Sequence, residues 1–525
     1  MLVTNCSRLL FCLGLSLACI LPAVPAASGQ MAPINPPPGW KQVPQGSGAC
    51  SVEKSCAELA PAMIQSALGA SPLEENLRYL TDSIGGRVTG SPEADRAVGW
   101  AVEALRRAGV DDVHTEKFTV PAGWSEGHTH AEVLAPVAFS IRLVSTGWSP
   151  PIPEGGITAG VVDAGDGDDA GFAKVGAAAN GAIVLIHTKE LATLEDLAGE
   201  YLADPAIIER ARKTGAAAIF WMSTRPNLLL YRHTTALSGE PALLPQAIVA
   251  REDAGRLARF LASKQEVRVH FEMPNRVSGP VESENVVAEI RGREKPEEFV
   301  LLGAHLDSWD LGTGALDNGC NVALVIDAAR VIHASGTIPR RSIRFVLFTG
   351  EEQYMLGSWA YARAHRAELD NMAAAVVYDA GDGAVTGYSL GGRKDTLAAV
   401  REALEPAKSL GVKEFTLDAG IDTDNFDFLL EGVLALVANQ ETANYLLNYH
   451  AASDTFDKVD IGQLKQNTAI AAVTVYALAD APQRIGPRQS RAEIEQLMKE
   501  TGLDQEMKLM GFWPSWEKGE RGRQP

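Results

Sequence analysis

The stretch "EEFVLLGAHLDSWDLGTGALDNG" (residues 297–319) joins a continuous apolar run to a strongly charged segment. The run from Phe299 to Ala304 has the length and composition of a strand buried on both faces, as in a parallel sheet. Ligands of open α/β sheets gather at the carboxyl ends of the strands, which favours a functional strand end here. A plain polar loop is the simpler interpretation. The charged side chains that follow the run are His305, Asp307, Asp310 and Asp317.

Three further apolar runs end in a similar way. "SIRFVLFTGEE" ends at Glu351 and Glu352, "MAAAVVYDAG" carries Asp379 directly after its apolar part, and "GVLALVANQ" precedes the loop that holds His450. Segments with helical periodicity, such as "NVALVIDAARVIHA", lie between these runs. Strands that alternate with helices predict an α/β fold, with a mostly parallel mixed sheet sandwiched by helices.

Between residues 150 and 270 the pattern changes to short β-like runs, such as "AGVVDA" and "GAIVLIH", separated by glycine-rich turns. We expect a smaller α/β domain there, inserted into the larger one. The predicted layout is a signal peptide at 1–26, a lead-in at 27–69, a large domain at 70–149 and 271–485, the insert at 150–270, and a C-terminal helix and tail at 486–525.

The N-terminus indicates export. Its apolar run "LLFCLGLSLACIL" is too short to span a bilayer, and Val24 and Ala26 suit signal-peptide cleavage after Ala26. Lipoprotein anchoring at Cys19 is the weaker alternative. We therefore predict a secreted or periplasmic protein without a later transmembrane segment, in which Cys50 and Cys56 could form a disulfide.

Composition narrows the choice of partners. Acidic residues outnumber basic ones by 66 to 47, which gives a formal net charge of −19. Binding to nucleic acid requires a basic face, so we expect no nucleic-acid partner.

Histidine and carboxylate side chains at strand ends are typical ligands of zinc and similar metals. A pair of metals needs one bridging carboxylate and further ligands for each ion. Adjacent glutamates suit this chemistry, because one can bind a metal while the other accepts a proton from water. A solvated glutamate pair at a helix start and a buried structural histidine are the alternatives. Asp379 is favoured over Asp382, since it directly follows the strand.

The motifs "AHLDSWDLGTGALDNG", "FTGEEQYMLGS", "YDAG" and "NYHAASDTFDKVD" resemble, in this order, the metal-binding motifs of the M28 family of zinc metallopeptidases, and within it the carboxypeptidase Q branch. The resemblance spans about residues 70–480. The insert resembles the protease-associated (PA) domain that many of these enzymes carry.

The resemblance implies two zinc ions. Asp317 would bridge them, His305 and Asp379 would complete one site, and Glu352 and His450 would complete the other.

It also implies that Glu351 is the general base and that the carboxylate of Asp307 orients the His305 imidazole. The sequence departs from the branch in three places: at Asn318 after the bridging aspartate, at Gln353-Tyr354 after the paired glutamates, and at Cys320. These departures concern specificity more than activity.

We thus expect a di-zinc exopeptidase, an aminopeptidase or dipeptidase acting on peptides with a free N-terminus. A carboxypeptidase stays open, because Arg393 could hold a terminal carboxylate. A glutaminyl cyclase, which has one working zinc, and a non-catalytic receptor of the same fold are disfavoured by the complete ligand set. The sequence leaves open whether the protein forms a homodimer.

Overall fold

The computed structural model of the chain describes residues 55–524. The expected signal peptide, the alternative anchor Cys19 and the half-cystine candidate Cys50 lie outside these residues, so those predictions stay untested. In the described part, no helix is both long enough and apolar enough to cross a membrane.

The first of two large sheets has eight strands in the order β1-β12-β14-β13-β15-β18-β16-β17. Its centre is parallel, from β14 through β13 and β15 to β18, while β1 and β12 form an antiparallel edge. The bounds are β1 (Asp112–Val120), β12 (Val281–Ile290), β13 (Lys295–His305), β14 (Arg341–Phe348), β15 (Met372–Val377), β16 (Val385–Ser389), β17 (Glu414–Thr416) and β18 (Ala435–Gln440).

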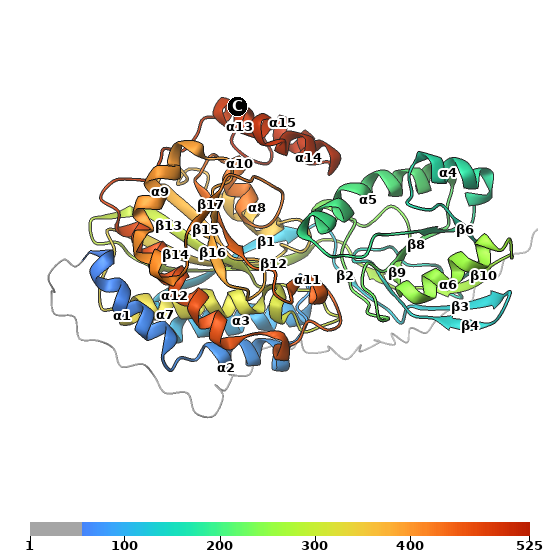
Figure 1. Cartoon of the computed structure of the whole chain (residues 1–525), viewed down its shortest axis with the longest axis horizontal. Coiled ribbons are helices and arrows are strands. Elements are labelled where there is room, and N and C mark those ends of the chain that lie inside the picture. The colour runs from blue at the N-terminus through green and yellow to red at the C-terminus, as the bar shows by residue number, and fades with distance from the viewer. Residues whose placement is uncertain (1–54, 525) are drawn as a thin grey trace, which may run out of the picture. The chain divides into compact units, whose positions relative to one another are not determined.

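Helices cover both faces of this sheet, because its central strands are apolar on both sides. In β13, Val300 and Leu302 belong to one hydrophobic core and Leu301 to the other. The first core is covered by α1 (Cys56–Leu68), α2 (Leu73–Arg78), α3 (Pro92–Arg107), α7 (Cys320–Ala334), α9 (Leu397–Ala403) and α12 (Ile461–Asp480). The second is covered by α8 (Leu356–Ala364), α10 (Asn425–Leu430), α13 (Arg491–Thr501), α14 (Leu503–Leu509) and α15 (Trp513–Glu517). Figure 1 shows this arrangement, which confirms the predicted fold class.

The second sheet has the order β4-β3-β10-β6-β7-β8-β9-β5, with β6 to β9 parallel. Its strands are β3 (His130–Ala135), β4 (Phe139–Ile141), β5 (Leu143–Ser145), β6 (Ile157–Asp163), β7 (Ile183–Ile186), β8 (Ala218–Met222), β9 (Gln246–Val249) and β10 (Arg268–Glu272). Its helices are α4 (Asp169–Val175), α5 (Leu194–Thr214) and α6 (Arg251–Ala262). We call residues 130–272 the insert. A ribbon of β2 (Trp124–Ser125) and β11 (Arg276–Val277) flanks it in the chain.

The insert begins earlier than the sequence suggested. Strands β3 to β5 lie before residue 150, in a segment that we had expected to belong to the large domain, yet they pair within the second sheet. Side chains of β3 alternate between buried and more exposed, which is the pattern of a strand with one face against a core. The resemblance of the insert to a PA domain stays a prediction.

The C-terminal segment is packed against the large sheet's second core. The guanidinium of Arg521 is buried and donates to both carboxylate oxygens of Asp427, at 2.8 and 2.9 Å. Removing one partner of such a buried pair costs about 3–5 kcal/mol. The expected single helix and tail are therefore three short helices followed by an anchored end.

Candidate metal centre

Two candidate ligands extend from neighbouring parallel strands. His305 is the last residue of β13, and Asp379 follows β15 by two residues. The two strands pair in register up to Gly303 and Val377, so both side chains emerge at the same sheet edge. Their closest atoms, His305 Nε2 and Asp379 Oδ1, are 3.0 Å apart.

Asp317 lies between two histidines. Its Oδ1 is 3.2 Å from His305 Nε2, and its Oδ2 is 3.1 Å from His450 Nε2. The same His450 nitrogen is 2.9 Å from Glu352 Oε2. The turn that carries Asp317 depends on Gly314, which has a φ of +61° and leaves no room for a side chain beside Ser308. The structure thus brings together all five side chains predicted as metal ligands.

These five side chains are buried, with exposed fractions of at most 8%. Two of their oxygens, Asp317 Oδ2 and Glu352 Oε1, have no hydrogen-bond partner. Buried polar atoms are normally satisfied, so two unpartnered carboxylate oxygens in a cluster that also contains two histidines fit a cation-binding site. The donor set of imidazole and carboxylate groups fits a metal such as zinc.

The electrostatics of the cluster point the same way. Burial, together with the Asp317 carboxylate, raises the pKa of Glu352 to about 7. Burial also raises the pKa of Asp379 and, strongly, that of Glu351. Although burial disfavours an imidazolium, the Glu352 and Asp317 carboxylates raise the pKa of His450 to about 9. The acid groups thus exceed the positive charge around them, and a divalent cation would relieve the excess.

Glu351 belongs to the same cluster. One ligand atom each from His305, Glu351 and Asp379 can be chosen so that all lie within 4.8 Å of one another. A second such group joins His305, Asp317 and Glu352. Glu351 is therefore close enough to act on a molecule held at the metal positions.

Asp307 supports the cluster in a way that differs from the expectation. The Nδ1 atom of His305 lies 3.0 Å from the Asp307 backbone carbonyl oxygen but 3.6 Å from its carboxylate. The carbonyl, rather than the carboxylate, therefore accepts from the imidazole. The Asp307 carboxylate accepts instead from the Thr89 hydroxyl at 2.8 Å and from the amides of Glu351 and Glu352, both at 3.3 Å. It holds the glutamate loop in place.

Three further acidic residues differ in how they lie relative to the cluster. Asp310 pairs with Arg232 at 2.8 Å, and Asp382 accepts from the amide of Asp460, so neither faces the metal positions. Asp424 is fully buried, and both its carboxylate oxygens lack a hydrogen-bond partner. Burial raises the pKa of Asp424, and the charges of His305 and Asp379 act on it, which places it near the cluster.

Two supporting residues were missed from the sequence. Asp454 accepts from the amides of Leu316 and Asp317, at 2.7 and 3.1 Å, and so fixes the backbone of Asp317, the candidate bridging ligand. Arg87 is fully buried and donates to the carbonyls of residues 306, 313 and 314, which fixes the loop before Asp317. Asp454 falls inside the motif "NYHAASDTFDKVD", whereas Arg87 carries no local pattern that could have revealed it.

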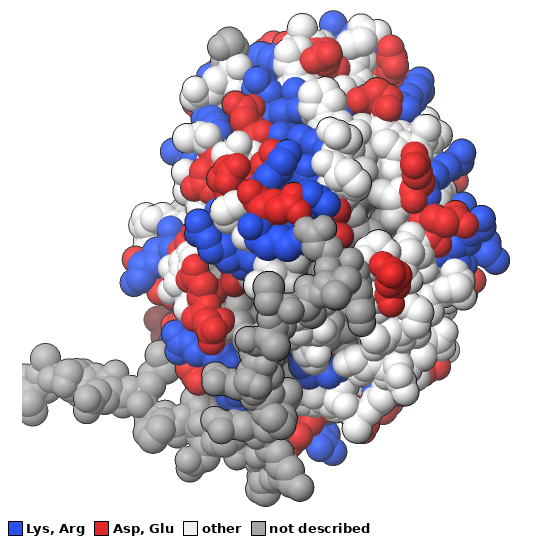
Figure 2. Space-filling model, turned by 90° about the vertical axis from the view of Figure 1, so that its left-hand side faces the viewer, with Lys and Arg blue, Asp and Glu red and all other residues white. Residues whose placement is uncertain are grey.

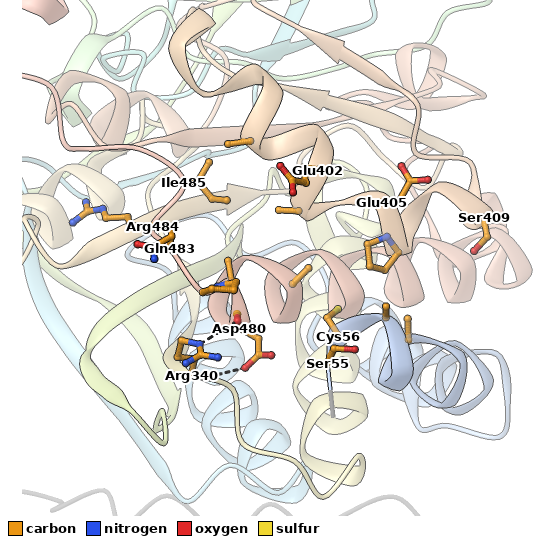
Figure 3. Close-up of a pocket in the computed structure, with 18 of the residues that line it drawn as sticks. Ser55, Cys56, Arg340, Glu402, Glu405, Ser409, Asp480, Gln483, Arg484 and Ile485 are labelled. Atoms are coloured by element: carbon orange, nitrogen blue, oxygen red, sulfur yellow. Dashed lines mark hydrogen bonds between the residues drawn. The ribbon is translucent and has the colours of Figure 1, made fainter. Parts of the chain in front are cut away.

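The candidate metal centre does not lie in a large cavity. A pocket of only about 10 Å³ is lined by Asp317, Glu352, His450 and Asp454. A much larger cavity of about 1000 Å³ lies beside α1 and the end of α12, and no residue of the cluster lines it. Figure 3 shows charged side chains among its lining residues, such as Asp480, which accepts from the Arg340 amide.

Charged side chains of both signs lie on one face of the molecule. On the face shown in Figure 2, basic and acidic side chains are interspersed, and no continuous basic surface is visible.

Comparison with known proteins defines the class. The model of peptidase family M28 matches residues 285–475, which include all the candidate ligands. Carboxypeptidase Q of Mus musculus is 30% identical over 409 residues, covering 77% of this chain and 85% of the relative. The chain belongs to peptidase family M28 and is a metallopeptidase.

Two solved structures share the fold. An M28 peptidase precursor from Shewanella amazonensis is 29% identical, with a TM-score of 0.75 over 83% of this chain and 99% of that one. The zinc aminopeptidase BSAP from Bacillus subtilis is 21% identical, with a TM-score of 0.62 over 80% of this chain and 97% of that one.

Proposed function

We propose that this protein is an exported di-zinc exopeptidase that hydrolyses the peptide bond next to a free N-terminus, as an aminopeptidase or dipeptidase. The observation that carries the proposal is the position of Asp317, whose two carboxylate oxygens face two different histidines. A single carboxylate placed in this way can bridge two metal ions.

The proposed ligand sets follow from the same contacts. His305, Asp317 and Asp379 would hold one zinc, and Asp317, Glu352 and His450 would hold the other. When bound, the two ions would act as Lewis acids that polarise the scissile carbonyl and lower the pKa of an attacking water. The unpartnered oxygens of Asp317 and Glu352 support this assignment, and BSAP, a zinc aminopeptidase, shares the fold.

Glu351 is proposed as the general base and acid. It lies in the cluster with His305 and Asp379, and burial raises its pKa well above that of a free carboxyl group. A raised pKa makes a carboxylate a better proton acceptor near neutral pH. Glu351 would take a proton from the attacking water and later deliver it to the leaving amine.

The charges around the centre favour a free N-terminus. Arg393, the residue considered as an anchor for a terminal carboxylate, is buried and donates to Asp395 at 2.8 and 2.9 Å. Arg87 and Arg232 are likewise fully engaged in hydrogen bonds. The excess of buried carboxyl groups instead suits a substrate ammonium group. Carboxypeptidase action is the second candidate, because the relative from mouse bears that name.

The proposal includes export of the protein from the cytoplasm. The apolar N-terminal run and the small residues before position 27 support export, although they lie outside the described residues. Dimerisation and the PA-like character of the insert stay predictions.

A panel of dipeptides tests the proposed specificity. Each peptide is offered with both ends free, with an acetylated N-terminus, and with an amidated C-terminus. We expect acetylation to abolish hydrolysis and amidation to be tolerated. Cleavage of acetylated peptides together with loss of activity on amidated ones would establish the carboxypeptidase instead.

A further inference from the structure

The loop that carries His450 is paired with the insert through its backbone. Tyr231 and Ala451 form an antiparallel bridge. The amide of Arg232 donates to the carbonyl of His450 at 3.0 Å, and the amide of Ala452 donates to the carbonyl of Leu230 at 3.0 Å. Residues 230–232 of the insert and 450–452 of the large domain are therefore joined by one isolated antiparallel bridge with two backbone hydrogen bonds.

The same loop is part of the insert's hydrophobic core. Ala451 is 1% exposed and packs in one cluster with Tyr231, Trp221 and Ile248 of the insert. His450 itself has a φ of +57°, a conformation that side-chain-bearing residues adopt rarely and keep only when their surroundings impose it. Here the neighbouring residue is fixed by packing against the insert.

Side chains add a second connection. Tyr449 stacks its ring on the His450 imidazole, with centroids 3.7 Å apart and planes inclined by 20°. Its hydroxyl is 3.0 Å from that of Tyr201 on α5, and its carbonyl accepts from the Arg225 guanidinium at 3.0 Å. Tyr201 and Arg225 both belong to the insert, so they act on His450 through Tyr449.

We propose that the insert is a structural part of the metal centre, with Tyr201 and Arg225 as positioning residues for His450. Binding of the metal at Glu352 and His450 is then coupled to the packing of residues 230–232 on the His450 loop. The other half of the centre has no such dependence, since His305 and Asp379 extend from the central strands of the large sheet. The inference rests on the proposed function only in taking His450 as a metal ligand.

Coupling of this kind is reciprocal, so removal of the metal must loosen the insert at the same place. Hydrogen exchange of the full-length protein, with zinc bound and after chelation, measures this directly. We expect chelation to speed exchange at the amides of Arg232 and Ala452, with little change in β4 at the far edge of the insert's sheet. Unchanged exchange at residues 230–232 would overturn the proposal.

A conservative variant supplies the second test. Tyr201→Phe removes one hydroxyl and should weaken zinc binding at Glu352 and His450 about three- to tenfold, the range for one lost hydrogen bond, and should leave zinc binding at His305 and Asp379 unchanged. Tyr476→Phe is the matched control, because Tyr476 is buried in α12 beside Thr337, outside the cluster. Zinc titration against a competing chelator provides the affinities.

The zinc titration distinguishes the positioning role of Tyr201 from the proposed two-zinc function. If wild-type protein binds two zinc ions but Tyr201→Phe matches it in both affinities, the positioning role is wrong and the proposed function stands. If wild-type protein binds a single zinc ion and Tyr201→Phe weakens it, the two-zinc function fails and the positioning role stands. If wild-type protein binds no zinc, both fail.

Discussion

His305 and Asp379 extend from β13 and β15, two neighbouring parallel strands in the middle of a sheet that is covered on both faces, whereas Glu352 and His450 lie on loops. Hydrogen bonds from the amides to Asp307 hold the loop of Glu352, and the insert holds that of His450. Asp317 faces a histidine of each half. The half with His305 and Asp379 is thus fixed by the central sheet. The half with Glu352 and His450, which we call the loop-held half, is fixed by contacts between distant segments.

The largest effect is expected at the residue that the halves share. Asp317→Asn keeps the size of the side chain but removes the charge that both metal positions use. Both zinc ions should be lost, and turnover should fall to background. Metal analysis after dialysis, together with an activity assay, checks this. A variant that keeps one tightly bound zinc would show that Asp317 belongs to one half alone.

The next effect separates catalysis from metal binding. Glu351→Gln cannot accept a proton, so kcat should fall by at least ~10²-fold, the lower end for general acid–base catalysis, while zinc content stays near that of the wild type. Glu352→Gln should instead lose zinc from the loop-held half, and part of its activity should return at high zinc. If the two variants behave the other way round, their roles are reversed.

Stability of the metal-free protein should depend on pH through the loop-held half. The pKa of His450 is raised from 6.5 to about 9, so the stability that its protonated form contributes is fully present below pH about 6.5 and lost as the pH rises through about 9. The raised pKa of Glu352, about 7, acts in the same direction at lower pH. Thermal unfolding of chelated protein from pH 6 to 9.5 should therefore show a falling Tm.

Zinc provides the control for that measurement. A bound cation takes the place of the protons, so the loaded protein should show a smaller fall over the same range. An equal fall with and without zinc would place the responsible groups outside the centre.

The smallest effect is expected at Arg393. Its guanidinium is occupied by Asp395 and by backbone carbonyls, so Arg393→Lys should leave KM for dipeptides within about twofold, even if stability decreases slightly. A tenfold or larger rise in KM, seen for peptides with a free C-terminus and absent for amidated ones, would restore the carboxypeptidase interpretation.

The difference between the two halves of the centre also explains which residues the sequence could predict. His305 and Asp379 were recognisable because each follows a continuous apolar strand, and strand ends of a parallel sheet meet at one edge. The resemblance to the M28 motifs supplied the division of roles between Glu351 and Glu352. Both kinds of information are local in the chain.

What escaped prediction depends on contacts between distant segments. The buried Arg87 and the backbone bridge between residues 230–232 and 450–452 leave no periodicity or motif in the sequence. Asp454 lies inside a motif, but its hydrogen bonds to residues 316 and 317 cannot be read from that motif. The early start of the insert at β3 was missed for another reason. Its alternating pattern indicates a strand, but not the sheet to which that strand belongs.

Zinc stoichiometry measured alongside activity tests the central claim most directly. The purified protein should contain two zinc ions per chain, lose its peptidase activity when both are chelated, and regain it as zinc is returned. The loop-held half should empty first. A protein that holds one zinc or none and still turns over at its full rate would contradict the two-metal centre.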